Sequence, residues 1–240
     1  LKAQAEAECE VGDFSTAIGT FDKALALDPD NAEIKAERDE AARKAEAKRL
    51  QAQGEAELAA GDYSKAVDTL LAALKLDPTN TVVAQEEQTA EKKDLAAELK
   101  AEADQMMDYD KFLDAAETYG KAAALDTDNT ALLKLQADAL DKAKAQELKA
   151  VGEHQMEAED YPAAVEAFDE ALEYDPHNAE ILEMRDDCAH IAKALELKAQ
   201  AEAEMAAGEY EKAVETFLAA LEEDPDNMDV AKEEKDAEKM

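Results

Sequence analysis

Apolar positions along the chain recur with the period of a helix. Between residues 63 and 76, apolar residues stand at i, i+1, i+4, i+7 and i+8, which is one face of a helix: Ala66, Val67, Leu70, Ala73 and Leu74. β-Branched residues are few, and no segment alternates apolar and polar residues, so nothing in the pattern indicates a sheet. The sequence therefore predicts an all-α protein.

The helical pattern repeats every 49 residues along the whole chain. An aromatic residue recurs at this interval, at Phe14, Tyr63, Phe112, Tyr161 and Tyr210. An alanine follows it three residues later each time, at Ala17, Ala66, Ala115, Ala164 and Ala213. No insertion or deletion disturbs the register, which indicates that every unit packs on its neighbours through the same contacts. We expect one helical repeat array of five units, at about residues 1–49, 50–98, 99–147, 148–196 and 197–240.

Each repeat contains three predicted segments, which repeat two illustrates. Segment A covers about residues 47–60 and ends at Gly61, since glycine suits a left-handed helix end. Segment B covers about residues 63–76 and ends at Asp77-Pro78, because proline removes a backbone donor. Segment C starts near Thr81 and meets no Gly or Pro before Met107, in segment A of repeat three. We expect C and the following A to form one helix of about 28 residues, or ~42 Å.

Segment C carries an apolar stripe of its own. The first position of the stripe is occupied by Ile34, Val83, Leu132, Ile181 and Val230. Seven residues later come Ala41, Ala90, Ala139, Cys188 and Ala237. This pattern predicts that C packs on A and B of its own repeat. Because C continues into the next A, each repeat would be displaced by about 20 Å, giving an elongated rod of about 100 Å. A side-by-side superhelical array of long and short helices is the alternative.

Segments A and B together resemble the tetratricopeptide repeat. In repeat two, the family pattern is matched by Leu50, Gly54, Gly61, Tyr63, Ala66, Leu70, Ala73 and Pro78. The resemblance covers about 34 of every 49 residues and implies a helical repeat fold, with segment C as an addition. The best-known peptide site of the family is a basic clamp for acidic chaperone tails. One lysine position of that clamp is kept, at Lys2, Lys100, Lys149 and Lys198.

The remaining clamp positions do not match. Gln51 interrupts the lysine series, and an acidic side chain stands one turn later in every repeat, at Glu6, Glu55, Asp104, Glu153 and Glu202. An acidic peptide would meet carboxylates there, so we do not expect chaperone-tail binding. The spacing of lysine and carboxylate instead predicts helix-stabilising pairs at i, i+4.

Charge limits the classes of partner. The 240 residues carry 61 acidic and 26 basic side chains, for a net charge of −35. Nucleic acid and anionic membranes would be repelled, and no apolar run is long enough to span a bilayer. Counted over 49-residue blocks, repeats four and five carry −11 and −9, against −4 to −6 in the others. A basic partner is therefore expected to prefer residues 160–238.

Candidate chemistry is sparse. The only serines are Ser15 and Ser64, no Gly-x-Ser-x-Gly motif occurs, and no histidine has a second histidine at i+3 or i+4. The two cysteines, Cys9 and Cys188, align with apolar residues of the other repeats and are interpreted as buried. We predict no enzyme activity and no cofactor. Asp28-Pro29-Asp30-Asn31 resembles the start of a calcium loop, but Glu33 replaces its glycine, so a helix-capping role is favoured.

Three functional hypotheses follow. The first is a structural or scaffolding protein, a spacer or interaction platform within a longer chain of such repeats, as in a filament or cytoskeletal assembly. The second is a recognition domain for basic peptides that uses the inner faces of the A segments, at Gln51, Glu55, Asp104, Glu153 and Glu202. The third is an acidic, calcium-responsive structural element. We expect protein or peptide partners, or further copies of the repeat, and an intracellular, cytoplasmic or cytoskeletal location.

Overall fold

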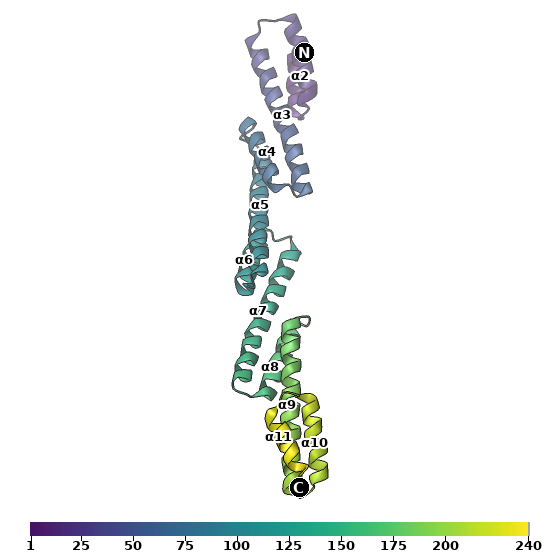
Figure 1. The fold of residues 1–240 in the computed structure, drawn as a ribbon. Coiled ribbons are helices and arrows are strands. Elements are labelled where there is room, and N and C mark those ends of the chain that lie inside the picture. Colours follow the sequence, from purple (N-terminus) through teal and green to yellow (C-terminus); the bar gives the residue numbers. More distant parts are fainter. Residues whose placement is uncertain (240) are drawn as a thin grey trace. The chain divides into compact units, whose positions relative to one another are not determined.

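A computed structural model describes residues 1–239, which form helices joined by short turns and contain no strand. Eleven helices lie within these residues (Figure 1). They are α1 (Lys2–Glu10), α2 (Phe14–Leu27), α3 (Ala32–Ala60), α4 (Tyr63–Leu76), α5 (Thr81–Asp108), α6 (Phe112–Leu125), α7 (Thr130–Glu157), α8 (Tyr161–Tyr174), α9 (Ala179–Ala206), α10 (Tyr210–Glu223) and α11 (Met228–Ala237). The all-α helical repeat predicted from the sequence is confirmed.

The predicted fusion of segment C with the next segment A is also confirmed. The fused helices α3, α5, α7 and α9 are 28 or 29 residues long, and each B helix between them has 14 residues. The long helices have no internal proline, and their few glycines do not interrupt them. A single helix thus belongs to two successive repeats (Figure 1).

The chain divides into two compact units. The first consists of Leu1–Gln105 and Thr118–Leu133, and the second of Met106–Glu117 and Lys134–Met240. In the first unit, α2 packs on α1 and α3, and α4 packs on α3. In the second unit, α9 packs on α8 and α10, and α10 packs on α11. Helices that follow one another in sequence are therefore neighbours in space within each unit.

The turns are fixed by local hydrogen bonds of the kind the sequence indicated. The side-chain oxygens of Asn31, Asn178 and Asn227 each accept a hydrogen bond from the backbone N–H three residues later, at 3.2 Å. This bond satisfies a donor that a helix start leaves free. At the other end, Gly61 closes α3 with a φ of 81°, a left-handed conformation that glycine adopts without strain. The polar turn residues therefore act as helix caps.

Repeats one, two, four and five each have a small core of their own, and the fused helices α3 and α9 each contribute to two of these cores. In the second unit, α9 supplies Ile181 and Cys188 to a core around Phe168, and Ala201 to a core around Phe217. The stripe predicted on segment C is buried in every repeat, from Ile34 at 7% exposure to Val230 at 0%. Its predicted packing role is thus confirmed.

A buried carboxylate joins the A and B helices of repeat five. Glu204 on α9 accepts hydrogen bonds from Thr216 at 2.7 Å and Gln200 at 2.9 Å, and pairs with Lys212 at 2.9 Å. These contacts, that of Gln200 first, lower the pKa of Glu204 from its ordinary 4.5 to about 2. The ionised form is therefore the one that holds α9 and α10 together near neutral pH.

Candidate functional site

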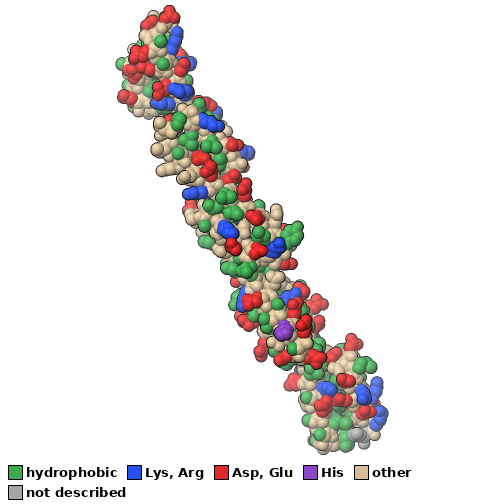
Figure 2. Space-filling view, turned by 90° about the vertical axis from the view of Figure 1, so that its left-hand side faces the viewer, with side chains coloured by type: hydrophobic (Ala, Val, Ile, Leu, Met, Phe, Trp, Pro, Cys, Tyr) green, Lys and Arg blue, Asp and Glu red, His purple; other side chains and the backbone are tan. Residues whose placement is uncertain are grey.

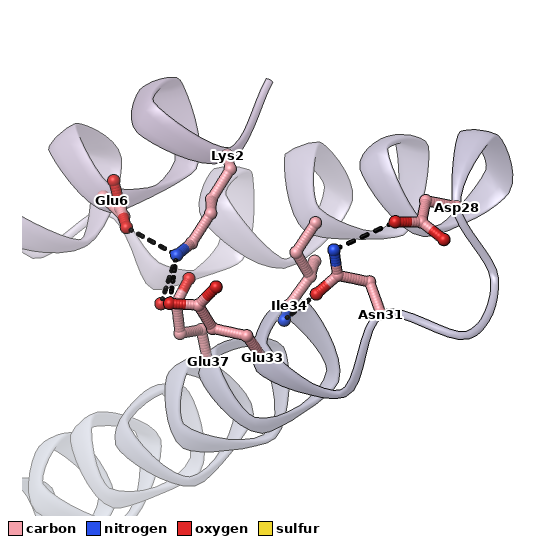
Figure 3. A network of polar contacts seen from close by, with 7 residues as sticks. All are labelled: Lys2, Glu6, Asp28, Asn31, Glu33, Ile34 and Glu37. Carbon is pink, nitrogen blue, oxygen red and sulfur yellow. Dashed lines mark hydrogen bonds and ion pairs between the residues drawn. The ribbon is translucent and has the colours of Figure 1, made fainter.

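The predicted lysine position lies at the junction of segments A and C, where it links two helices. In repeat one, the Lys2 ammonium on α1 pairs with Glu6 on its own helix at 3.4 Å. It also reaches α3, where it pairs with Glu33 at 2.8 Å and Glu37 at 3.0 Å (Figure 3). The two carboxylates of α3, Glu33 first, raise the pKa of Lys2. The Lys2 ammonium therefore links segment C to segment A through ion pairs.

The same link recurs in the last two repeats. Lys149 pairs with Glu153 at 3.4 Å and with Glu180 of segment C at 2.7 Å. Lys198 pairs with Glu202 at 3.4 Å and with Glu233 of segment C at 3.4 Å. The predicted i, i+4 pairs are confirmed, and a second pair across helices, which the sequence analysis did not foresee, accompanies them.

Repeat two lacks the ammonium at this junction. Gln51 stands in the lysine position, and its amide donates to Glu55 at 3.0 Å and to both oxygens of Glu86, at 3.2 and 3.3 Å. Burial first, and then the charge of nearby Glu55, raise the pKa of Glu86. Two carboxylates thus face each other across α3 and α5 with a neutral amide between them.

Replacing Gln51 with lysine is expected to stabilise repeat two. The new ammonium would neutralise the Glu55–Glu86 pair as Lys2 does for Glu6 and Glu37, which hold the same repeat positions, with a gain of about 0.5–1 kcal/mol at pH 7 for a partly exposed pair. A raised pKa means that ionised Glu86 costs stability as pH rises, so the gain should shrink when acid protonates Glu86.

Urea unfolding of Gln51→Lys at pH 7 and pH 4 checks this expectation. Gln51→Met is the matched control, because it keeps the side-chain length but carries no charge and no donor. An equal gain for lysine and methionine, or a lysine gain that does not depend on pH, would contradict the electrostatic explanation.

A groove with an acidic rim lies between segments A and C of repeat one, and we call it groove one. Its volume is about 390 Å³, and its lining comprises Glu6, Cys9, Glu10, Phe21, Glu37, Glu40, Ala41 and Lys44. The Phe21 ring is 1% exposed and belongs to the core of the repeat, so the groove has an apolar floor. Four of the eight lining side chains are carboxylates.

Repeat five has a groove at the same repeat positions, which we call groove five. Its volume is about 220 Å³, and it is lined by Glu202, Met205, Phe217, Glu233 and Asp236. Each of these residues is 196 positions after a lining residue of groove one, which is four repeats of 49. The floor is again a buried phenylalanine, and the rim again consists of carboxylates.

The five predicted partner-binding residues take different positions. Glu202 lines groove five. Gln51 and Glu55 lie at the junction in repeat two, and Glu153 pairs with Lys149.

Burial opposes ionisation of Asp104, but hydrogen bonds from Lys100 at 2.7 Å and Tyr119 at 2.6 Å outweigh it and lower its pKa. None of the five therefore stands apart from contacts inside its own repeat.

The sequence analysis missed the rim residues of segment C. In groove one these are Glu37 and Glu40, and in groove five they are Glu233 and Asp236. The signal was present, because in both repeats two acids three residues apart stand between the two positions of the segment C stripe.

The two cysteines differ. Cys188 is fully buried in the core of repeat four, as predicted. Cys9 is only half-buried, because it lines groove one instead of lying beneath the core. Burial is the main cause that raises the pKa of both thiols, so neither thiol is activated as a nucleophile.

The described residues show neither a metal-binding cluster nor a helix suited to a membrane. Within residues 1–239, no three or more His, Cys, Asp or Glu side chains gather so that they could hold a metal ion. Asp28, in the calcium-like turn, accepts a hydrogen bond from Asn31 at 3.0 Å (Figure 3). None of the helices between Leu1 and Lys239 combines the length and the apolar character that crossing a bilayer requires.

Comparisons with solved structures and curated proteins add little. Matching structures include the "TPR2AB-domain:pHSP90-complex of yeast Sti1", at 22% sequence identity and a TM-score of 0.21, over 98% of this chain and 82% of that chain. No curated protein matches the chain.

Family models give the informative matches. Two models described as tetratricopeptide repeat match the chain, one over residues 47–80 and the other over residues 152–200 and 198–231. Neither model describes an enzyme family. The matched segments cover A and B of repeats two and five, and in repeat four they cover the second half of A together with B and C. These matches identify tetratricopeptide repeats in residues 47–80 and 152–231.

Proposed function

We propose that the chain is a non-enzymatic scaffold whose fused helices space successive tetratricopeptide-like repeats for protein–protein interaction. Tetratricopeptide repeats generally serve as protein-interaction modules, and the family matches support that class for this chain. The extra segment C is what makes this array a spacer. In the proposal, all five 49-residue units are such repeats.

The observation that carries the proposal is that one helix serves two separate cores. On α9, Ile181 belongs to the core of repeat four and Ala201 to the core of repeat five. Twenty residues of helix separate them, which at 1.5 Å per residue is about 30 Å. A continuous helix resists bending far more than a loop does, so it would hold the two repeats at a defined separation.

Distance measurement between spin labels on α9 tests the spacer function. Labels at Glu183→Cys and Ala203→Cys, in a Cys9→Met and Cys188→Ala background, lie 20 residues apart on exposed positions. We expect a single narrow distribution near 30 Å, set by the helix rise. A broad or two-peaked distribution would show that the helix bends between the repeats, and the spacer proposal would fail.

Recognition of a basic segment is the second candidate function, and the two acidic grooves favour it. The net charge of −35 would speed and strengthen the approach of a basic partner at low salt. Figure 2 shows acidic side chains over much of the visible face, with fewer basic ones. The grooves add local sites with an apolar floor, which a uniformly charged surface does not offer.

A further inference from the structure

We propose that grooves one and five each bind a lysine or arginine side chain from a basic segment of a partner protein. This inference rests on the second candidate function and names its sites. Both grooves lie between segments A and C of a repeat, at identical repeat positions, although they belong to different compact units.

The floor of each groove suits the aliphatic part of such a side chain. Phe21 in groove one and Phe217 in groove five are each 1% exposed, and Cys9 or Met205 lies beside them. Lysine and arginine bury their methylene stems on apolar surface while the charged group stays near polar partners. Volumes of about 390 and 220 Å³ leave room for one such side chain.

The carboxylates at the rim of each groove suit the charged end of the guest lysine or arginine side chain. Groove one has four glutamates and one lysine in its lining, and groove five has three carboxylates and no basic residue. Lysines of the chain already pair with part of each rim: Lys44 with Glu40 at 3.0 Å in groove one, and Lys198 with Glu202 and Glu233 at 3.4 Å in groove five. Because an ionised carboxylate accepts about four hydrogen bonds, a guest guanidinium or ammonium would donate to the acceptor sites that these lysines leave open.

Repeat one already shows how a cation is held at this place. The Lys2 ammonium lies 2.8 Å from Glu33 and 3.0 Å from Glu37, both on segment C (Figure 3), and Glu37 also lines groove one. In repeat four the corresponding position is Met184, which packs against the core. Repeat four therefore offers no carboxylate at this position, and we do not expect it to bind a lysine or arginine side chain in this way.

Binding of a dye-labelled peptide of alternating lysine and alanine, followed by fluorescence anisotropy at low salt, tests the proposal. The groove variant combines Glu37→Gln, Glu40→Gln, Glu233→Gln and Asp236→Asn. The matched control removes four charges from exposed faces of α8 and α10, by Glu166→Gln, Glu170→Gln, Glu215→Gln and Glu222→Gln. We expect the dissociation constant of the groove variant to be about tenfold higher than that of the control.

A second readout uses the unmutated protein. With methionine methyl groups labelled for NMR, the signal of Met205 on the floor of groove five should shift on peptide addition. The signal of Met228, which is 80% exposed and outside the groove, should not. This readout does not depend on the stability of any variant.

The outcomes separate the inference from the function on which it rests. Equal weakening in both four-charge variants, or binding that leaves Met205 unshifted, would overturn the grooves as sites while keeping recognition of basic segments. Absence of peptide binding to the unmutated protein would overturn both. The spacer proposal is judged by the spin-label distances alone.

Discussion

Substituting proline for Lys193 is expected to separate the folding of repeats four and five. Lys193 lies on α9 between Cys188, in one core, and Leu197, which packs against the next. Proline there removes the hydrogen bond to the carbonyl four residues earlier, and its ring clashes with that carbonyl, at a cost of about 3 kcal/mol or more. Because each repeat gains stability from its neighbour, the break should also weaken the coupling between the two.

Chemical unfolding followed by circular dichroism provides the measurement. We expect a lower midpoint and a less steep or two-step transition, since repeats that no longer unfold together expose less surface in each step. Lys193→Ala is the control, because it removes the 2.7 Å ion pair with Glu196 but keeps the helix. A proline variant whose transition overlays that of the alanine variant would show that α9 does not transmit stability between the repeats.

The course of the helices was predictable because the determinants are local. Gly61, the Asp-Pro turns and the capping asparagines mark helix ends in the sequence, and the structure places the ends of α3 and α4 there. The length of α5 followed from the absence of any Gly or Pro between Thr81 and Met107. The strict 49-residue period also made the contacting helix faces predictable, because an insertion or deletion would have turned the buried stripe of segment C towards solvent.

The polar contacts were less predictable, because periodicity fixes the face of a residue but not the reach of its side chain. Lys2 fits an i, i+4 pair with Glu6, yet its shorter contacts are with Glu33 and Glu37 on another helix. Which partner a flexible lysine selects depends on how segments A and C pack. For the same reason the grooves were missed, since they need side chains from three segments at once.

Truncating Phe168 to alanine is expected to be the most destabilising single core change in repeat four. The ring is fully buried and lies in a cluster with Leu148, Ile181 and Cys188. Loss of the buried ring and the cavity left behind should cost about 3–5 kcal/mol. Phe168→Leu, which copies Leu70 at the same position of repeat two, should cost clearly less, because leucine refills most of the space. Urea unfolding of the three proteins gives the comparison.

A double-mutant cycle with Gly152 shows whether the ring itself sets the packing of the A and B helices. A Cβ at Gly152 would overlap the Phe168 ring, whereas alanine is the better helix former by about 1 kcal/mol. In the unmutated protein, the steric overlap and the gain in helix propensity oppose each other. Repeat one has Ala5 at the position of Gly152 and Phe21 at the position of Phe168, which shows that the two helices can shift to accommodate both side chains. With Phe168→Ala the overlap is gone, so Gly152→Ala should stabilise by more than it does in the unmutated protein, with a coupling of about 1–2 kcal/mol. Additive effects would mean that the helices already accommodate the methyl group, and that the close approach at Gly152 is not required for packing.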